Sequence, residues 1–112
     1  MNRSLKLLMR GGGIAALSAL ASCFHFQGSV KDPGADRASA DLSQLEADPQ
    51  LASRAPVALK EAQEAVAAAE EPQKDPALSA HLVYIADRKV QTARALAEAH
   101  VAEDQLKALQ GR

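Results

Sequence analysis

The feature that most constrains the fold of this chain is a long stretch, Ala77 to Gln110, that contains neither glycine nor proline. These two residues interrupt helices, and Gly111 follows at the place where a helix C-terminus favours glycine. The stretch therefore predicts one helix about 50 Å long. Its expected apolar stripe, within which Lys89 also falls, consists of Leu78, Leu82, Ile85, Ala86, Ala93, Leu96, Ala97 and His100.

A second, shorter helix is expected before this stretch, because residues 56–71 are rich in strong helix formers. Two Asp-Pro pairs, Asp48-Pro49 and Asp75-Pro76, predict helix starts, since Asp caps a helix and Pro suits its first position. The shorter helix then either begins at Pro49 and kinks near Ala55, or begins at Pro56. Because a short loop favours antiparallel neighbours, the predicted fold is all-α: an antiparallel helical hairpin with one long C-terminal helix.

The two predicted helices have unequal lengths, about 24 Å against about 50 Å. The far half of the long helix is therefore uncovered unless residues 41–54 fold back over it. A protein partner or a homo-oligomer could cover it instead, and both explanations stay open. Few large apolar residues lie between Ala55 and Gln110, so the expected core is thin for a small domain.

The N-terminus has the three zones of a secretory signal peptide, with basic residues up to Arg10, a short apolar region and a small-residue cleavage zone. Leu20-Ala21-Ser22-Cys23 resembles the bacterial lipobox. This resemblance implies cleavage before Cys23, a covalent lipid on its thiol, and a stable membrane anchor without a transmembrane helix. The alternative is a secreted protein with a free thiol. Phe24 stands where Asp favours inner-membrane retention, so we expect the periplasmic side of a Gram-negative outer membrane.

Three regions follow from these features: a signal peptide at residues 1–22, a lipidated N-terminus and flexible tether at 23–40, and a helical hairpin domain at 41–112. Three of the 13 basic residues fall in the signal peptide, which leaves ten against 14 acidic residues and a net charge of −4. This charge argues against binding to nucleic acid, which favours basic surfaces. It also provides no polybasic patch for lipid headgroups, so the lipid is the expected membrane contact.

Aromatic and ionisable side chains lie closest together in the run "HLVYIADRK". His81, Tyr84 and Arg88 share one flank of the helix there, and Lys89 follows. We interpret these four residues as a candidate partner-binding patch. The alternative is that Tyr84 packs between the helices and its hydroxyl bonds Arg88 or a backbone carbonyl. No catalytic set or phosphate loop stands out, so no enzyme activity is expected.

A metal site is also not expected. His100 and Asp104 are spaced to share a helix face, but zinc requires three or four ligands with supporting contacts. The two remaining histidines, His25 and His81, lack ligand spacing. No cofactor is therefore predicted apart from the covalent lipid.

The runs "APVALKEAQEAVAAAEEPQKDP" and "HLVYIADRKVQTARALAEA" resemble an alanine-rich helical domain of bacterial envelope lipoproteins, domain of unknown function 4398. The resemblance covers roughly Leu45 to Leu109 and implies an outer-membrane lipoprotein with a helical hairpin facing the periplasm. The family domain often precedes an OmpA-like peptidoglycan-binding domain, which we do not expect after Arg112. The resemblance implies no catalytic residues.

The expected function is a non-catalytic structural or interaction module of the cell envelope. Direct contact with peptidoglycan through the charged residues of the long helix, or an accessory role in a periplasmic complex, are the alternatives.

Overall fold

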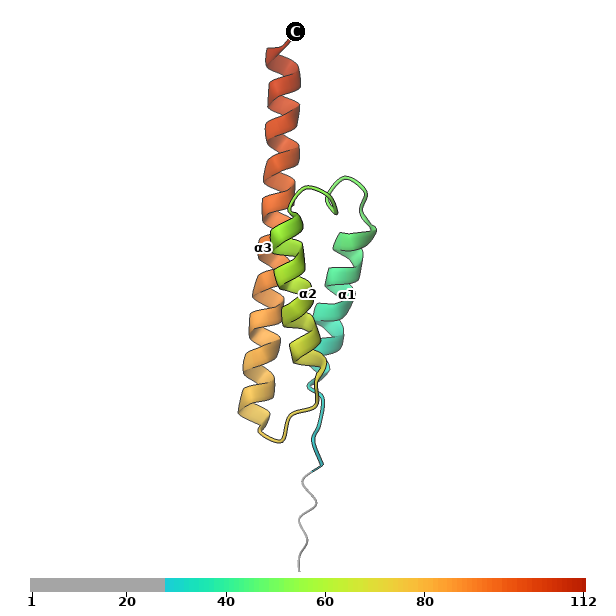
Figure 1. Cartoon of the computed structure of the whole chain (residues 1–112), viewed down its shortest axis with the longest axis vertical. Coiled ribbons are helices and arrows are strands. Elements are labelled where there is room, and N and C mark those ends of the chain that lie inside the picture. The colour runs from blue at the N-terminus through green and yellow to red at the C-terminus, as the bar shows by residue number, and fades with distance from the viewer. Residues whose placement is uncertain (1–27) are drawn as a thin grey trace, which may run out of the picture.

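A computed structural model describes residues 28–112 of the chain, which form three α-helices joined by short loops (Figure 1). Helix α1 spans Pro33–Ala47, α2 spans Pro56–Glu70 and α3 spans Pro76–Gln110. The helices lie side by side, and α3 continues well past the ends of the other two (Figure 1). The all-α class and the long C-terminal helix are therefore confirmed. The signal peptide and Cys23 lie outside the described residues.

Helix α1 was not predicted, and it corrects the boundary between tether and domain. Residues 33–40 were assigned to a flexible tether, but they form the first half of α1. The Asp32 side chain caps this helix by accepting from the Gly34 backbone N–H at 2.7 Å, and Pro33 occupies its first turn. Its buried residues follow one helical face: Ala35, Ala38, Leu42 and Leu45. The folded domain thus begins at Pro33 rather than at residue 41.

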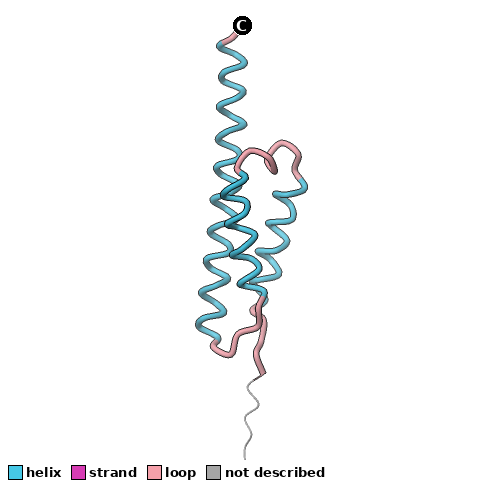
Figure 2. The backbone as a smooth tube through the Cα atoms, viewed as in Figure 1, coloured by secondary structure: helices cyan, strands magenta, loops and turns pink. Residues whose placement is uncertain are grey.

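The two Asp-Pro pairs that predicted helix starts behave differently. Asp75 caps α3, since its side chain accepts from the Ala77 N–H at 2.9 Å. Asp48 instead follows the last residue of α1 and accepts from the Gln50 N–H at 2.8 Å within a run of turns. The prediction of a helix start at Pro49 is therefore wrong. Helix α2 begins at Pro56, which was the second of the two alternatives, and a loop separates it from α1 (Figure 2).

The core between the helices consists mainly of alanine. All three helices contribute, and the buried apolar residues in the cluster are Ala35, Ala38, Leu42, Leu45, Ala62, Val66, Ala69, Ala86, Val90 and Ala93. Small side chains let the helix backbones approach closely, since the distance between packed helices depends on the side chains at the contact. Each alanine buries little apolar area, so the core is thin, as predicted.

The buried face of α3 is rotated from the predicted apolar stripe. It consists of Ser79, Ala86, Val90, Ala93 and Ala97. Leu78 and Leu96 were expected to be buried, but each is 44% exposed, and His100 is also exposed. The physical reason is size: at a close helix contact, alanine and valine fit where leucine would hold the helices apart.

Residues 41–54 cover the far half of α3 only in part. Helix α1 packs against both other helices, and the turns after it reach α3 near His100. There the His100 Nδ1–H donates to the Arg54 carbonyl oxygen at 2.6 Å, and the Arg54 guanidinium contacts the Asp104 carboxylate. Every residue from Ala102 to Arg112 is exposed. The last three turns of α3 therefore project beyond the bundle.

None of the three helices is both long enough and apolar enough to cross a membrane, a finding that covers residues 28–112.

Candidate functional site

The side of α3 that faces away from the bundle is the candidate functional site, and we call it the outer face. At about 100° per residue it lies roughly half a turn around the helix from the buried residues. Its members are all exposed: Tyr84, Arg88, Gln91, Ala95, Ala99, Ala102, Leu106 and Leu109. Tyr84, Leu106 and Leu109 are 61%, 58% and 64% exposed. Such large apolar side chains, aligned on one helix face, are typical of interaction sites.

The structure brings three of the four predicted patch residues together on this side of α3. His81, Tyr84 and Arg88 are exposed there. The Arg88 guanidinium donates to the Gln91 side-chain oxygen at 3.4 Å, and the Thr92 hydroxyl donates to the Arg88 carbonyl at 2.8 Å. Because Tyr84 is largely exposed, the alternative in which it packs between helices is wrong.

Lys89 does not join the other three residues of the predicted patch. Its ammonium Nζ lies 2.6 Å from a carboxylate oxygen of Glu61 on α2, so its side chain connects two helices. It lies about 100° around α3 from Arg88. Sequence spacing alone places Lys89 next to Arg88, but only the packing of α2 shows that Lys89 belongs to the bundle side.

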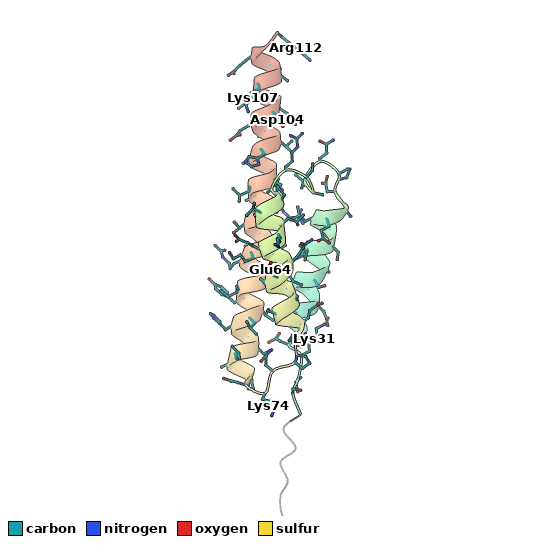
Figure 3. All side chains as sticks on the ribbon, viewed as in Figure 1. Lys31, Glu64, Lys74, Asp104, Lys107 and Arg112 are labelled. Atoms are coloured by element: carbon teal, nitrogen blue, oxygen red, sulfur yellow. The ribbon has the colours of Figure 1, made fainter. Side chains whose placement is uncertain are left out.

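The outer face changes character along α3. Its first half carries the polar side chains of Arg88 and Gln91, whereas Ala95, Ala99, Ala102, Leu106 and Leu109 are apolar. Charged residues flank the apolar part, and Asp104, Lys107 and Arg112 mark the projecting end (Figure 3). The C-terminal half of α3 therefore combines an apolar stripe with charged edges, as helices do that pair with other helices.

At the opposite end of the molecule, Lys31 connects the start of α1 to the end of α2 (Figure 3). Its ammonium lies 2.5 Å from Asp36 and 3.8 Å from Glu70. The hydrogen bond to Asp36 raises the pKa of Lys31 above its usual 10.5, Glu70 adds to this effect, and desolvation opposes it. The ammonium therefore stays charged at any physiological pH, and it fixes the entry of the chain into the bundle.

A hollow of about 310 Å³ lies beside Lys31 and is lined by residues of the α2–α3 loop, the chain before α1 and the first turn of α3. Ser79 lies at its wall, and the Ser79 hydroxyl is buried without a hydrogen-bond partner among residues 28–112. Lys74 is the second cation at this wall.

His100 and Asp104, the helix pair considered for metal binding, both contact Arg54. Within the described part of the chain, no three His, Cys, Asp or Glu side chains gather in a group that could hold a metal ion. Sequence reasoning missed the role of Arg54, because it lies in a loop 50 residues away from Asp104 and no local pattern connects the two.

These features define a small, alanine-packed three-helix domain whose last helix presents an exposed face. The chain belongs to the family described as Domain of unknown function (DUF4398), whose model matches residues 34–109. The match begins in the first turn of α1 and ends one residue before the end of α3, so it spans the whole bundle and includes α1. No curated protein and no solved structure matches the chain.

Proposed function

We propose that this protein is a non-catalytic, lipid-anchored module of the cell envelope that binds another protein chain through the outer face of α3. The observation that carries the proposal is the projection of α3 beyond the bundle with Leu106 and Leu109 more than half exposed. A helix end of about three turns is marginally stable in water when no tertiary contacts support it. Binding of a partner to the outer face would supply that support.

The anchor in this proposal is Cys23, within the lipobox-like run Leu20 to Cys23. A multiply acylated cysteine would hold the chain stably on the periplasmic side of an outer membrane. Because the Val30 backbone N–H already donates to the Gln73 carbonyl of the α2–α3 loop, the connection from Cys23 to the bundle is about seven residues, which reach about 25 Å when extended. The bundle would therefore lie closer to the membrane than a tether through residue 40 allows.

Two measurements test the two parts of the proposal. Intact-mass analysis of the membrane-extracted protein should show a chain that begins at Cys23 and is heavier by its lipids. A chain that retains Ser22, or an unmodified thiol, would contradict the anchor.

For the binding surface, a photo-crosslinking amino acid is placed at Leu106 in the full chain and irradiated in intact cells. We expect covalent adducts with a protein chain. The matched control carries the same amino acid at Ala67, an exposed position on α2, and should give no comparable adduct. Adducts of equal yield at both positions, or none at Leu106, would contradict the proposal.

A further inference from the structure

We infer that the outer face of α3 binds a second copy of this chain, with the two projecting helix ends paired antiparallel. This inference rests on the proposed function, because it names the partner of the same surface. The spacing, the sizes and the charges of residues 95–112 support it.

The apolar outer-face residues in the C-terminal half of α3 follow the spacing of a coiled-coil seam. Ala95, Ala99, Ala102, Leu106 and Leu109 are separated by four, three, four and three residues. This alternation is the a/d pattern of helices that pack side by side with knobs in holes. All five residues are exposed and lie on the side of α3 away from α1 and α2. A second helix can therefore dock here without displacing the bundle.

The sizes of these residues favour an antiparallel pairing of the two helices over a parallel one. When Ala102 of one copy faces Leu106 of the second copy, Ala99 faces Leu109 of the second copy. The two-fold symmetry repeats both layers, so each of the four layers contains one small and one large side chain. Such alternation fills the space between helices evenly. A parallel pair would instead place alanine against alanine and leucine against leucine.

The charges at one edge of the seam agree with this register. Glu98 of one copy then lies beside the C-terminal end of α3 of the second copy, where the side chain of Arg112, two residues past the helix, can reach it, and symmetry makes this pair twice. Gln105 lies near the symmetry axis and faces the same residue of the second copy, where two amides can exchange hydrogen bonds. Opposite charges at these flanking positions set the orientation of paired helices.

The other edge contains one unfavourable contact in this register, because Glu103 of each copy approaches Glu103 of the other. Like charges that face each other weaken an association. With only two leucines per copy in the seam, the interface is small and the association is weak in dilute solution. A lipid anchor would confine the copies to one surface and raise their effective concentration.

Cysteine crosslinking tests the register on the full chain in isolated membranes. The Gln105→Cys variant should form disulfide-linked dimers with an oxidant, whereas the Glu98→Cys variant alone should not. Coexpressed Glu98→Cys and Arg112→Cys chains should crosslink to each other. The wild-type chain, with Cys23 as its one cysteine, measures the background. Self-crosslinking of Glu98→Cys at the yield of Gln105→Cys would overturn the antiparallel arrangement.

Charge exchange provides the second arm of the test, read as the dimer fraction of the detergent-solubilised full chain. Glu98→Arg should reduce the dimer fraction several-fold, and Glu98→Arg with Arg112→Glu should restore it. Glu103→Gln should raise the fraction, because it removes the like-charge contact. The matched control is Glu64→Arg on α2, because the Glu64 side chain is 69% exposed. This variant should leave the dimer fraction unchanged. Failure of the double exchange to restore the dimer would overturn the register.

The outcomes separate this inference from the proposed function. Suppose that the chain photo-crosslinked at Leu106 is a different protein and that Gln105→Cys forms no dimers. Binding of a second copy is then overturned, while the outer face of α3 is still supported as a binding surface. If neither position yields any adduct, both the inference and the proposed binding surface are overturned.

Discussion

Gly34, in the first turn of α1, lies where this helix closely approaches α3. A Cβ atom on Gly34 would lie 2.6 Å from Cγ1 of Val83 and 3.1 Å from a carboxylate oxygen of Asp32. The valine side chain is short and branched, so it cannot move aside as a long side chain would. The absence of a side chain at Gly34 is therefore a packing requirement of the α1–α3 contact.

Gly34→Ala is expected to destabilise the bundle by about 1–3 kcal/mol, the usual effect of overpacking. Chemical denaturation of the variant measures this loss. Gly28→Ala is the control, since a Cβ on Gly28 meets nothing within 4 Å. Equal stability of the two variants would contradict the close contact between α1 and α3.

Asp32→Ala tests whether residues 33–40 are folded or form a tether. In the structure, the Asp32 side chain caps α1 through the Gly34 N–H, so its loss should cost about 1 kcal/mol of stability. Asp48→Ala removes the aspartate of Asp48-Pro49, an Asp-Pro pair that starts no helix, and should cost less. A variant Asp32→Ala as stable as the wild type would indicate that α1 does not contribute to the fold.

At the scale of the elements, α1 depends on a few side chains for its position against α2 and α3. Leu45 is 1% exposed and is the largest fully buried side chain of the described structure. The other buried side chains of α1 are those of Leu42 and two alanines. Leu45 therefore contributes a large share of the apolar area that holds α1 in place.

Leu45→Ala should reduce the free energy of unfolding by about 2–5 kcal/mol, the range for a buried leucine. In a core this thin, that loss should detach α1 or unfold the bundle, which circular dichroism during thermal unfolding would show. Leu78→Ala, at a leucine that is 44% exposed, should lose clearly less. Comparable losses in the two variants would contradict the docking of α1.

Much of the fold could be predicted from the sequence because α2 and α3 carry strong local patterns. The run without glycine or proline predicts α3, and Pro56 and Asp75 mark helix starts. Helix α1 escaped prediction because Ala35 and Ala38 contribute half of its buried face. Alanine is common on both exposed and buried helix faces, so its periodicity carries little information.

The candidate site was predictable only in part, again because small residues make up most of the buried face of α3. His81, Tyr84 and Arg88 share a flank by spacing alone. The orientation of that flank depends on which side of α3 packs inward, and the larger leucines shifted the predicted inward side around the helix from the buried one. Ala86, Ala93 and Ala97 of the predicted stripe do face the core, but Ser79 and Val90 complete the buried face in place of Leu78 and Leu96. This rotation leaves Leu106 and Leu109 on the exposed side of α3.

At the scale of the whole molecule, stability is expected to be uneven along α3. Residues up to Ala97 pack against the bundle, whereas the last three turns are exposed. Amide hydrogen exchange should therefore be slow in residues 86–97 and faster in residues 103–110 of the dilute protein, because unsupported helix ends open locally. Uniform protection along α3 in a monomeric sample would contradict the projection of its C-terminal end.

The central claim is that the outer face of α3 is covered by another chain in the cell envelope. Maleimide labelling of two matched variants of the full chain tests it most directly. Ala102→Cys lies on the outer face and Ala67→Cys on the exposed side of α2, and both alanines are exposed in the structure. In intact envelopes we expect Ala102→Cys to be protected and Ala67→Cys to be labelled. Both should be labelled equally in the dilute, detergent-solubilised protein, whereas equal labelling of the two positions in intact envelopes would contradict the claim.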